Sequence, residues 1–456
     1  MDRHLLDRLR SVSRSEPDGR RGAFYGWYVV GALFFATFLG VGTRQGFGVF
    51  VESWERDFGV SVGTISAAAA VGWVGNGLSQ PLFGRLTDAF GGRRVLVAST
   101  VAMGLGTVAM AGAQNVFALL VLYGFVVSAA GGGVFPTPAA AVVSRWFQRR
   151  RGTAMSFVTF GGSAGGIVLV PFAAYLLLAT DWRVAWLAMG GLVLALGVPL
   201  LLAIVRSDPG ELGLQADGDD HHDERVGAGP RPAVHAQTGP LVAREWPDSF
   251  RTSPIWQLSL AYGVCGVTTA MASVHYVRWA ATEGISPGTA ALAFGLLSAI
   301  NGAGLLTVGA ISDRMQRKNL LGGVYLVRAV AFVMLVALPG VPALWTFAVI
   351  GGMSWLATVP LTTSLTADVY GLRHIGTLNG LVTMAHQLGG AAAVLVAGFA
   401  FDRFGTYDVS FLAAAALLVV AGLLSLTIRE RAYSTRFQPV TAEAAATGRS
   451  YPTAAS

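Results

Sequence analysis

Long apolar runs separated by short polar stretches divide the chain into segments that each predict a helix. The runs show no alternation of period two, and at ~20–28 residues each is long enough to cross ~30 Å of hydrocarbon. Because lipid accepts only helices or closed barrels, the pattern predicts an all-α polytopic membrane protein. We expect twelve transmembrane helices near residues 25–52, 60–88, 94–112, 116–146, 152–178, 184–205, 254–282, 287–312, 319–338, 343–368, 373–401 and 407–428.

One apolar stretch occurs twice. Residues 59–88 read GVSVGTISAAAAVGWVGNGLSQPLFGRLTD, and residues 284–313 read GISPGTAALAFGLLSAINGAGLLTVGAISD. A repeat of this length, offset by 225 residues in a chain of 456, indicates a duplicated structural unit. We therefore expect two pseudo-symmetric six-helix halves, an arrangement found in a large class of secondary transporters. The identical pairs are Gly59/Gly284, Ser61/Ser286, Gly63/Gly288, Thr64/Thr289, Ala68/Ala293, Asn76/Asn301, Gly77/Gly302, Gly84/Gly309 and Asp88/Asp313.

Polar stretches set the expected boundaries. We predict an N-terminal tail at 1–24, a six-helix half at 25–205, a linker at 206–253, a second half at 254–428 and a C-terminal tail at 429–456. By the positive-inside bias, the basic gaps between spans are cytoplasmic, and so are the linker and both tails. This predicts a multi-pass protein of the cell (inner) membrane, monomeric in the bilayer. The basic residues are Arg85, Arg93, Arg94, Arg145, Arg149, Arg150, Arg151, Arg314, Arg317 and Lys318.

The composition supports the membrane class and excludes several functions. Hydrophobic residues make up 53% of the chain and charged residues only 12%, against ~25% charged in an ordinary soluble domain. The net charge of +7 comes from short loops beside apolar spans, so it does not indicate a nucleic-acid partner. With Cys265 the single cysteine, no internal disulfide can form. There is no Walker loop, no H-E-x-x-H and no cysteine cluster, so we expect no ATP-driven pumping, no metal and no cofactor.

The sequence contains features of three alternatives to a transporter. Residues 219–224 (DDHHDE) could be a metal cluster, but a solvated charge run suits a flexible linker better. Residues 161–165 (GGSAG) fit the G-x-S-x-G motif of serine hydrolases, and Ser163 could pair with His275 or His386. That motif needs a strand-to-helix turn, and here it lies in a predicted helix, so we expect no enzyme. A membrane receptor would need a folded signalling domain, which the short linker and tails do not offer.

Arg44 is the strongest candidate for substrate binding. It lies eight residues before Glu52, or ~12 Å along a helix, between the midplane and the outer face. A charge at this depth is costly and is therefore a functional candidate by default. The planar guanidinium matches a carboxylate, and small glycine neighbours leave room around it. The alternative is an arginine that reaches outward or pairs within the bundle.

Two histidines and their neighbours also lie inside predicted spans. His386 and the adjacent Gln387 are mid-span, where His386 could titrate near neutral pH or donate to an anion. A packed, hydrogen-bonded interior histidine is the alternative. His275 and Arg278 share a helix face near the outer end of their span. For Arg278, an anchor at the membrane interface is the favoured interpretation.

Asn76 and Asn301 occupy equivalent positions of the two repeats. They could line a central path, or they could hydrogen-bond one helix to another. No Asp or Glu is predicted deep in a span, so an acid-based proton relay is not evident.

A loop signature runs from Gly84 to Arg94 and is repeated in the second half. Other short motifs are Tyr25-Gly26-Trp27, Ser144 to Phe147 with Arg150 to Gly152, Trp182-Arg183, Pro209 to Leu214, His386 to Gly390 and Phe401 to Gly405. The loop signature resembles that of the major facilitator superfamily, and the other motifs resemble its monocarboxylate porter and oxalate/formate branch. The resemblance covers residues 25–428.

The resemblance implies roles for individual residues. Gly84 would let two helices close, while Asp88 and the basic residues latch the cytoplasmic side. A basic residue in the first span would contact the substrate carboxylate, and Arg44 stands near that position. The family often has an acid and an arginine in span eight, where this chain has Asn301 and Leu305. The latch set predicted in this way is Gly84, Asp88, Arg94, Gly309, Asp313 and Arg314.

These observations predict a secondary active transporter that moves a small organic anion, a monocarboxylate or dicarboxylate-like solute, by alternating access. Coupling is to protons or to a counter-anion. An efflux transporter of a neutral or amphiphilic compound is the alternative. The predicted substrate-binding residues are Arg44, His386, Asn301, Asn76, His275, Arg278 and Gln387.

Overall fold

The computed structural model describes residues 24–218, 241, 245–434 and 436–437, and within these it contains helices and no strands. In chain order the elements are α2 (Tyr25–Gln45), η1 (Gly46–Phe50), α3 (Val51–Phe58), α4 (Val62–Phe90), α5 (Gly92–Met110), α6 (Val116–Leu119), η2 (Leu120–Val127), α7 (Ser128–Gly132), α8 (Thr137–Trp146), α9 (Arg151–Ala179), α10 (Trp182–Leu192), η3 (Val193–Gly197), α11 (Val198–Ile204), η4 (Pro209–Leu212), η5 (Ala216–Gly218), η7 (Trp246–Arg251), α12 (Ser253–Thr282), α13 (Pro287–Ser312), α14 (Arg317–Ala337), α15 (Gly340–Ser354), α16 (Thr358–Tyr370), α17 (Ile375–Phe404), α18 (Asp408–Leu426) and α19 (Glu430–Tyr433).

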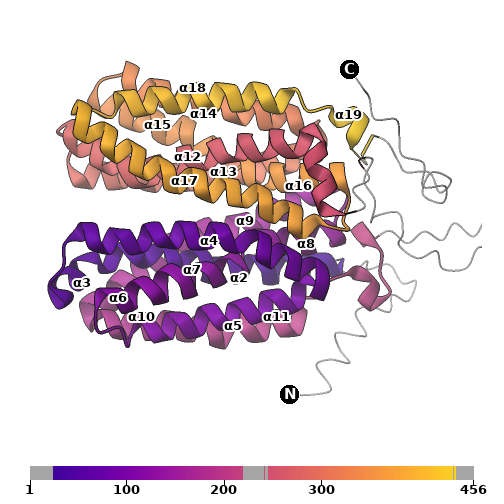
Figure 1. Ribbon diagram of the computed structural model, residues 1–456, viewed down its shortest axis with the longest axis horizontal. Coiled ribbons are helices and arrows are strands. Elements are labelled where there is room, and N and C mark those ends of the chain that lie inside the picture. The colour runs from indigo at the N-terminus through magenta and orange to yellow at the C-terminus, as the bar shows by residue number, and fades with distance from the viewer. Residues whose placement is uncertain (1–23, 219–240, 242–244, 435, 438–456) are drawn as a thin grey trace, which may run out of the picture.

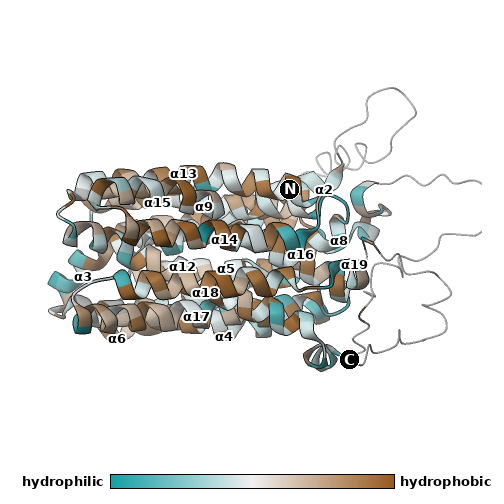
Figure 2. Cartoon of the chain, turned by 90° about the horizontal axis from the view of Figure 1, so that it is seen from above, coloured by the Kyte–Doolittle hydropathy of each residue, from teal (hydrophilic) through white to brown (hydrophobic). Residues whose placement is uncertain are grey.

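The helices form two bundles that lie side by side (Figure 1). One contains α2 to α11 and is called the N-terminal half; the other contains α12 to α18 and is called the C-terminal half. The described ends of the chain lie at the same end of the bundle as α8, α16 and α19, which we call the linker face. The opposite end carries α3 and is called the α3 face. Hydrophilic residues gather toward these two ends, and apolar residues predominate between them (Figure 2).

The expected spans are present. Eleven helical segments of the described chain are long and apolar enough to cross a membrane. The remaining expected span is α4, with 29 residues, whose polar side chains Asn76 and Gln80 lower its hydropathy. The predicted all-α fold of two six-helix halves is confirmed. The division of the chain at 206–253 stays a prediction, because much of that linker lies outside the described residues.

The two copies of the repeated stretch fold in the same way. Each begins with a serine N-cap whose hydroxyl accepts the main-chain N–H of a threonine three residues on: Ser61 from Thr64 at 3.3 Å, and Ser286 from Thr289 at 3.2 Å. Serine is favoured there because it satisfies one of the free N–H groups at a helix start. The copies become α4 and α13, so the sequence repeat marks equivalent helices of the two halves.

One span in each half is interrupted. The fourth span breaks between α7 and α8, where glycines at 131–133 and Pro136 disfavour a continuous helix. The tenth span breaks between α15 and α16, just before Pro360. An interruption exposes main-chain polar groups at membrane depth, and these need partners within the protein.

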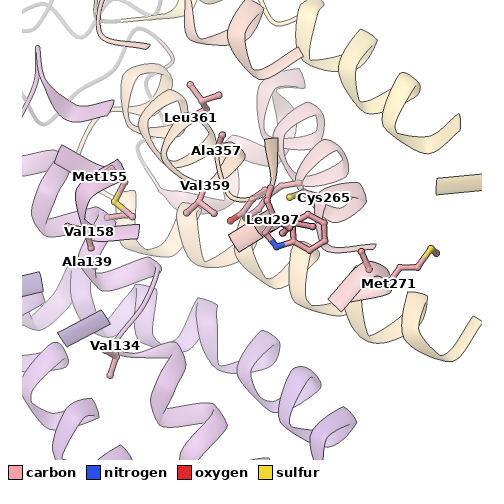
Figure 3. Packing of buried hydrophobic residues seen from close by; sticks show 14 of the residues in the cluster. Val134, Ala139, Met155, Val158, Cys265, Met271, Leu297, Ala357, Val359 and Leu361 are labelled. Atoms are coloured by element: carbon pink, nitrogen blue, oxygen red, sulfur yellow. The ribbon is translucent and has the colours of Figure 1, made fainter. Parts of the chain in front are cut away.

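Glycines allow the two halves to approach closely near the linker face. A Cβ atom added to Gly84 of α4 would overlap the carbonyl oxygen of Gly376 in α17. In the equivalent pair of helices, a Cβ on Gly309 of α13 would lie 3.0 Å from the carbonyl oxygen of Gly152 in α9. The apolar core continues through both halves, with Met155 on one side and Val359 on the other (Figure 3). The small residues therefore set the spacing of the halves at this end.

We predict that Gly84→Ala weakens this contact. The methyl group would displace the backbone of α17, and overpacking of this kind costs about 1–3 kcal/mol. The apparent melting temperature, followed by tryptophan fluorescence in detergent, should fall. Gly295→Ala is the matched control, because a Cβ there would have no neighbour within 4 Å. That control should be neutral or slightly stabilising, since Ala favours helix by about 0.5–1 kcal/mol. An equal effect of the two changes would contradict the close approach of α4 to α17 at Gly84.

Candidate functional site

The carboxylate of Asp88, near the end of α4, joins the two halves at the linker face. It accepts the main-chain N–H groups of Gly376 at 2.8 Å and Thr377 at 2.7 Å, and the Thr377 hydroxyl at 2.7 Å. These groups form the first turn of α17, in the other half. Four main-chain N–H groups are free at a helix start, and the helix dipole favours a negative charge there. Asp88 therefore caps a helix of the opposite half.

Asp313, the equivalent residue after α13, makes the same contact in the opposite direction. It accepts the main-chain N–H groups of Gly152 at 2.8 Å and Thr153 at 2.9 Å, and the Thr153 hydroxyl at 2.7 Å. These belong to the first turn of α9. The predicted latch residues Gly84, Asp88, Gly309 and Asp313 thus lie at two equivalent contacts between the halves.

Next to these caps lies a buried charge cluster that sequence reasoning did not find. The Arg151 guanidinium of α9 donates to Asp368 of α16 at 2.6 Å, so this ion pair also joins the two halves. Arg317 of α14 donates to the same Asp368 carboxylate and, at 3.1 Å, to Asp313. Asp368 and Arg317 are fully buried. Removing one member of a buried pair leaves an uncompensated charge, so such clusters are costly to break.

The remaining predicted latch residues lie elsewhere. The side chains of Arg94 and Arg314 are exposed and form no ion pair within the part of the chain that the structure describes. Arg317, three residues after Arg314, makes the contact to Asp313 instead. The latch role of Arg94 and Arg314 stays a prediction.

Residues after α18 hold the turn between α13 and α14. Glu430 of α19 accepts the main-chain N–H groups of Arg317 at 3.0 Å and Lys318 at 2.9 Å. Burial raises the pKa of the Glu430 carboxyl, although these N–H groups and the Arg317 charge act against the rise. Arg436 donates to main-chain carbonyls at the end of α13, among them that of Asp313 at 2.9 Å. Glu430 and Arg436 therefore hold the main chain at Arg317 and Asp313, the two residues of this turn that belong to the charge cluster.

Deeper in the bundle, Asn76 and Gln387 meet across the halves. The Asn76 side-chain oxygen accepts from the Gln387 amide of α17 and, at 3.2 Å, from that of Gln80. The Asn76 amide donates to the Ser128 carbonyl at 2.7 Å, close to the interrupted fourth span. Gln80 in turn accepts the hydroxyl of Thr137, which begins α8, at 2.5 Å. This chain of polar groups ties the interrupted span to α4 and to the other half.

Asn301 plays the equivalent part in the second half. Its side-chain oxygen accepts the Leu356 main-chain N–H at 3.0 Å, inside the break between α15 and α16. Its amide donates to the Ser163 hydroxyl of α9 at 3.0 Å, across the halves. Each repeat asparagine therefore stabilises an interrupted helix and bridges to the other half. Ser163, the residue of the G-x-S-x-G match, is mid-helix and bonds to this amide rather than to a histidine.

Arg44 lies in the N-terminal half near the last turn of α2. Its side chain packs over Gly131 of α7, where an added Cβ would approach the Arg44 Cδ to 3.0 Å. The Tyr123 hydroxyl donates to the Arg44 carbonyl at 3.0 Å. The guanidinium is half-buried, its Nε has no hydrogen-bond partner, and no carboxylate pairs with it among the described residues. It is therefore a charge within the bundle that the described protein does not neutralise.

The two candidate histidines face neighbouring helices of the C-terminal half. The His386 ring lies 4.6 Å from the ring of Tyr262, and its Nε2 is 3.4 Å from the Thr269 hydroxyl; both are on α12. His275 is buried, with its two ring nitrogens 3.2 Å from the Tyr407 hydroxyl and from the Val394 carbonyl. His275 thus occupies a packed, hydrogen-bonded site.

Arg278 lies toward the α3 face of α12. Its guanidinium is exposed and stacks over the ring of Phe401 at 5.3 Å. This position suits the anchor that the sequence favoured. The structure does not bring Arg278 and His275 together with Arg44 through any described contact.

Arg328 of α14 was not recognised from the sequence. It is fully buried and donates to the carbonyls of Ser354 and Trp355 at the end of α15, to the Cys265 sulfur at 3.2 Å and to the Thr268 hydroxyl at 3.3 Å. The only signal in the sequence is a single arginine ten residues into an apolar run. Because a charge inside a membrane span is costly and is therefore a functional candidate, Arg328 could have been identified from the sequence.

A metal site finds no support in the described residues, which contain no group of three metal-binding side chains. The candidate run at 219–224 lies outside the described residues.

Within the described chain, the hydrogen bonds between the halves all lie between the middle of the bundle and the linker face. Those of Asn76 and Asn301 lie near the middle of their helices, and those of Asp88, Asp313 and Arg151 lie at the linker face. Toward the α3 face, the described residues form no hydrogen bond between the halves. The bundle is therefore closed from its middle to the linker face.

Comparisons with known proteins support this architecture. The model of the family described as Major Facilitator Superfamily matches residues 33–394 and 258–451. Monocarboxylate transporter 12 of Rattus norvegicus is 23% identical over 91% of this chain and 87% of its own length. The probable sulfoacetate transporter SauU of Cupriavidus necator is 27% identical over 76% of this chain and 81% of its length.

Solved structures share the fold. The proton:xylose symporter XylE has a TM-score of 0.73 at 15% identity, covering 90% of this chain and 97% of that one. The human organic anion transporter MFSD10 has a TM-score of 0.63 at 15% identity, covering 88% and 99%.

We predict that Asp88→Asn loosens the linker face. Loss of the negative charge weakens three bonds to the start of α17, each of the charge-assisted kind that contributes about 1.5–3 kcal/mol. Spin labels at the exposed positions Phe90 and Arg373, in a Cys265→Ser background, should show a new population at longer distance. Asp402→Asn, an exposed acid at the far end of α17, is the matched control. A distance distribution unchanged by Asp88→Asn would refute the cap as a latch.

Proposed function

The chain belongs to the Major Facilitator Superfamily, and on this premise we propose that it carries a small organic anion across the cell membrane by alternating access. It is a multi-pass membrane transporter rather than an enzyme, as its relatives and structural neighbours are transporters. The anion is a monocarboxylate or a dicarboxylate-like solute. Its movement is coupled to protons or to exchange for a counter-anion.

Arg44 is the observation that carries this proposal. Among the arginines inside the bundle, Arg151 and Arg317 pair with carboxylates, and the fully buried Arg328 is enclosed by main-chain carbonyls and the Cys265 sulfur. Arg44 is half-buried and has no carboxylate partner among the described residues. A poorly solvated guanidinium without an anion is costly in an apolar interior, and an anionic substrate would remove that cost.

The surroundings of Arg44 suit a small ligand. Gly131, under its side chain, has no side chain of its own, so space beside the guanidinium depends on the missing Cβ. The fork of guanidinium donors fits the two oxygens of a carboxylate. The names of two relatives, a monocarboxylate transporter and a probable sulfoacetate transporter, agree with an acidic solute.

The closed linker face is the basis for assigning this state to a step of the transport cycle. If both termini are cytoplasmic, as the charge pattern predicts, the described state is closed to the cytoplasm. Rocking of the halves would break the caps of Asp88 and Asp313 and the Arg151–Asp368 pair together. The Asn76–Gln387 and Asn301–Ser163 bonds, next along the interface, would then separate and admit water to the middle of the bundle.

We predict that Arg44→Ala strongly reduces transport of carboxylates. Labelled lactate, pyruvate and sulfoacetate would be offered to proteoliposomes of wild type and variant. Loss of a hydrogen-bonded charge partner costs about 1.5–3 kcal/mol, which corresponds to a fall in kcat/KM of about 10- to 100-fold. Arg44→Lys should restore part of the uptake, because it keeps the charge and loses the fork.

The control is Arg251→Ala, which removes an exposed arginine outside the bundle interior and should leave uptake near wild type. Uptake of any of these acids at equal rates by wild type and Arg44→Ala would show that Arg44 does not bind the anion. Transport of none of them, with movement of a neutral solute instead, would favour the efflux alternative.

A further inference from the structure

The C-terminal half contains a second buried guanidinium with an unusual set of partners. Arg328 is fully buried, and its neighbours are the last carbonyls of α15, the Thr268 hydroxyl and the Cys265 sulfur. No carboxylate pairs with it within the described chain, and its Nε has no hydrogen-bond partner. Its charge is therefore balanced by dipoles and by whatever charge Cys265 supplies.

The dipoles do not neutralise the charge by themselves. A helix C-terminus is equivalent to roughly half a negative charge, and α15 ends at the guanidinium. A full positive charge taken out of water needs a compensating anion, because desolvation costs several kcal/mol per ion. The Cys265 sulfur, 3.2 Å from the Arg328 Nη1, is the one atom in this shell that can become an anion.

Polar and titratable groups surround Cys265. Its sulfur is 3.0 Å from the Thr358 hydroxyl of α16, and its carbonyl accepts the Thr269 hydroxyl at 2.8 Å, which is itself 3.4 Å from the His386 Nε2 of α17. Tyr262 of α12 and Tyr325 of α14 are the other titratable neighbours, and the buried Tyr325 hydroxyl has no partner in the described chain. No carboxylate faces the thiol from these helices. Figure 3 shows Cys265 in the C-terminal half, in the same buried cluster as Leu297.

We propose that Cys265 and Arg328 form a proton-binding pair, and that the carrier takes up its coupling proton there. In the unprotonated state a thiolate faces the guanidinium. On protonation an S–H bond forms from a sulfur electron pair, and the proton is taken from the aqueous phase. Arg328 is a positioning residue, since it holds the thiolate and does not itself exchange the proton.

This inference rests on the proposed anion carrier, and it supplies a group that could bind the coupling proton. The position equivalent to Asn76 in the second half holds Asn301, whose amide is occupied by Leu356 and Ser163, so no acid is available there. His386 and Gln387 are consecutive in α17, and Gln387 bonds to Asn76 across the halves. The Gln387–Asn76 bond would break when the halves rock. A change of charge at the thiol would therefore act close to this bond, because His386 precedes Gln387 in α17.

The first test follows the thiol directly. The S–H stretching band in the infrared spectrum of the purified protein can arise only from Cys265, because the chain has no other cysteine. We expect the band to be present at low pH and to disappear reversibly as the pH is raised. Cys265→Ser should lack the band at every pH, which verifies its assignment.

Charge-changing and charge-preserving variants separate the proposal from simple packing. Arg328→Gln should keep the band to distinctly higher pH than wild type, because the thiolate loses its counter-charge, whereas Arg328→Lys should retain the pH response. Thr358→Val is the matched control, since it removes an uncharged partner of the same sulfur. It should shift the frequency of the band and preserve its pH response. A band that never disappears while the protein stays folded would overturn the proposal, as would one whose titration is the same in wild type and Arg328→Gln.

The second test measures coupling. In proteoliposomes, Cys265→Ser should lose the accumulation of labelled lactate or sulfoacetate that an imposed pH gradient drives in wild type. Accumulation equal to wild type would show that the coupling proton binds elsewhere. If wild type moves neither acid, the anion proposal fails, and the infrared titration still decides the proton-binding pair.

Discussion

The cost of a charge inside an apolar bundle governs the arrangement of this protein. Three of the four interior arginines discussed above lie beside groups that offset their desolvation: Asp368 for Arg151 and Arg317, and helix carbonyls and the Cys265 sulfur for Arg328. Arg44 is the exception within the described chain, and the case for an anionic substrate follows from that exception. The same cost explains why the acids that close the linker face sit where free main-chain N–H groups converge, so that each carboxylate is hydrogen-bonded on burial.

The sequence duplication appears in the structure as reciprocity between the halves. The acid ending α4 caps α17, and the acid ending α13 caps α9, so each half holds the other through the same repeated element. The repeat asparagines extend this reciprocity inward, because Asn76 and Asn301 each serve an interrupted helix of their own half and a side chain of the opposite half. Pseudo-symmetry of this kind lets the two sides of the interface form or separate together.

Much of this could be predicted from the sequence, because span length and the repeat are local or periodic signals. The helix positions, the two halves and the equivalent positions of Asp88 and Asp313 in the repeat belong to that part. The charge cluster could not be predicted, since Arg151, Arg317 and Asp368 are far apart in the chain and meet only through packing. The basic residue predicted beside Asp313 was Arg314, whereas the turn between α13 and α14 places Arg317, four residues on, against it. Arg328 was a visible signal, a lone charge in an apolar run, whose partners only the fold defines.

The caps at the linker face contact mainly main-chain atoms. Asp88 and Asp313 each accept hydrogen bonds from two backbone N–H groups and one threonine hydroxyl. Most of these bonds therefore do not depend on which side chains the opposing helix carries. Side chains along α9 and α17 can therefore change without removing the main-chain partners of either carboxylate.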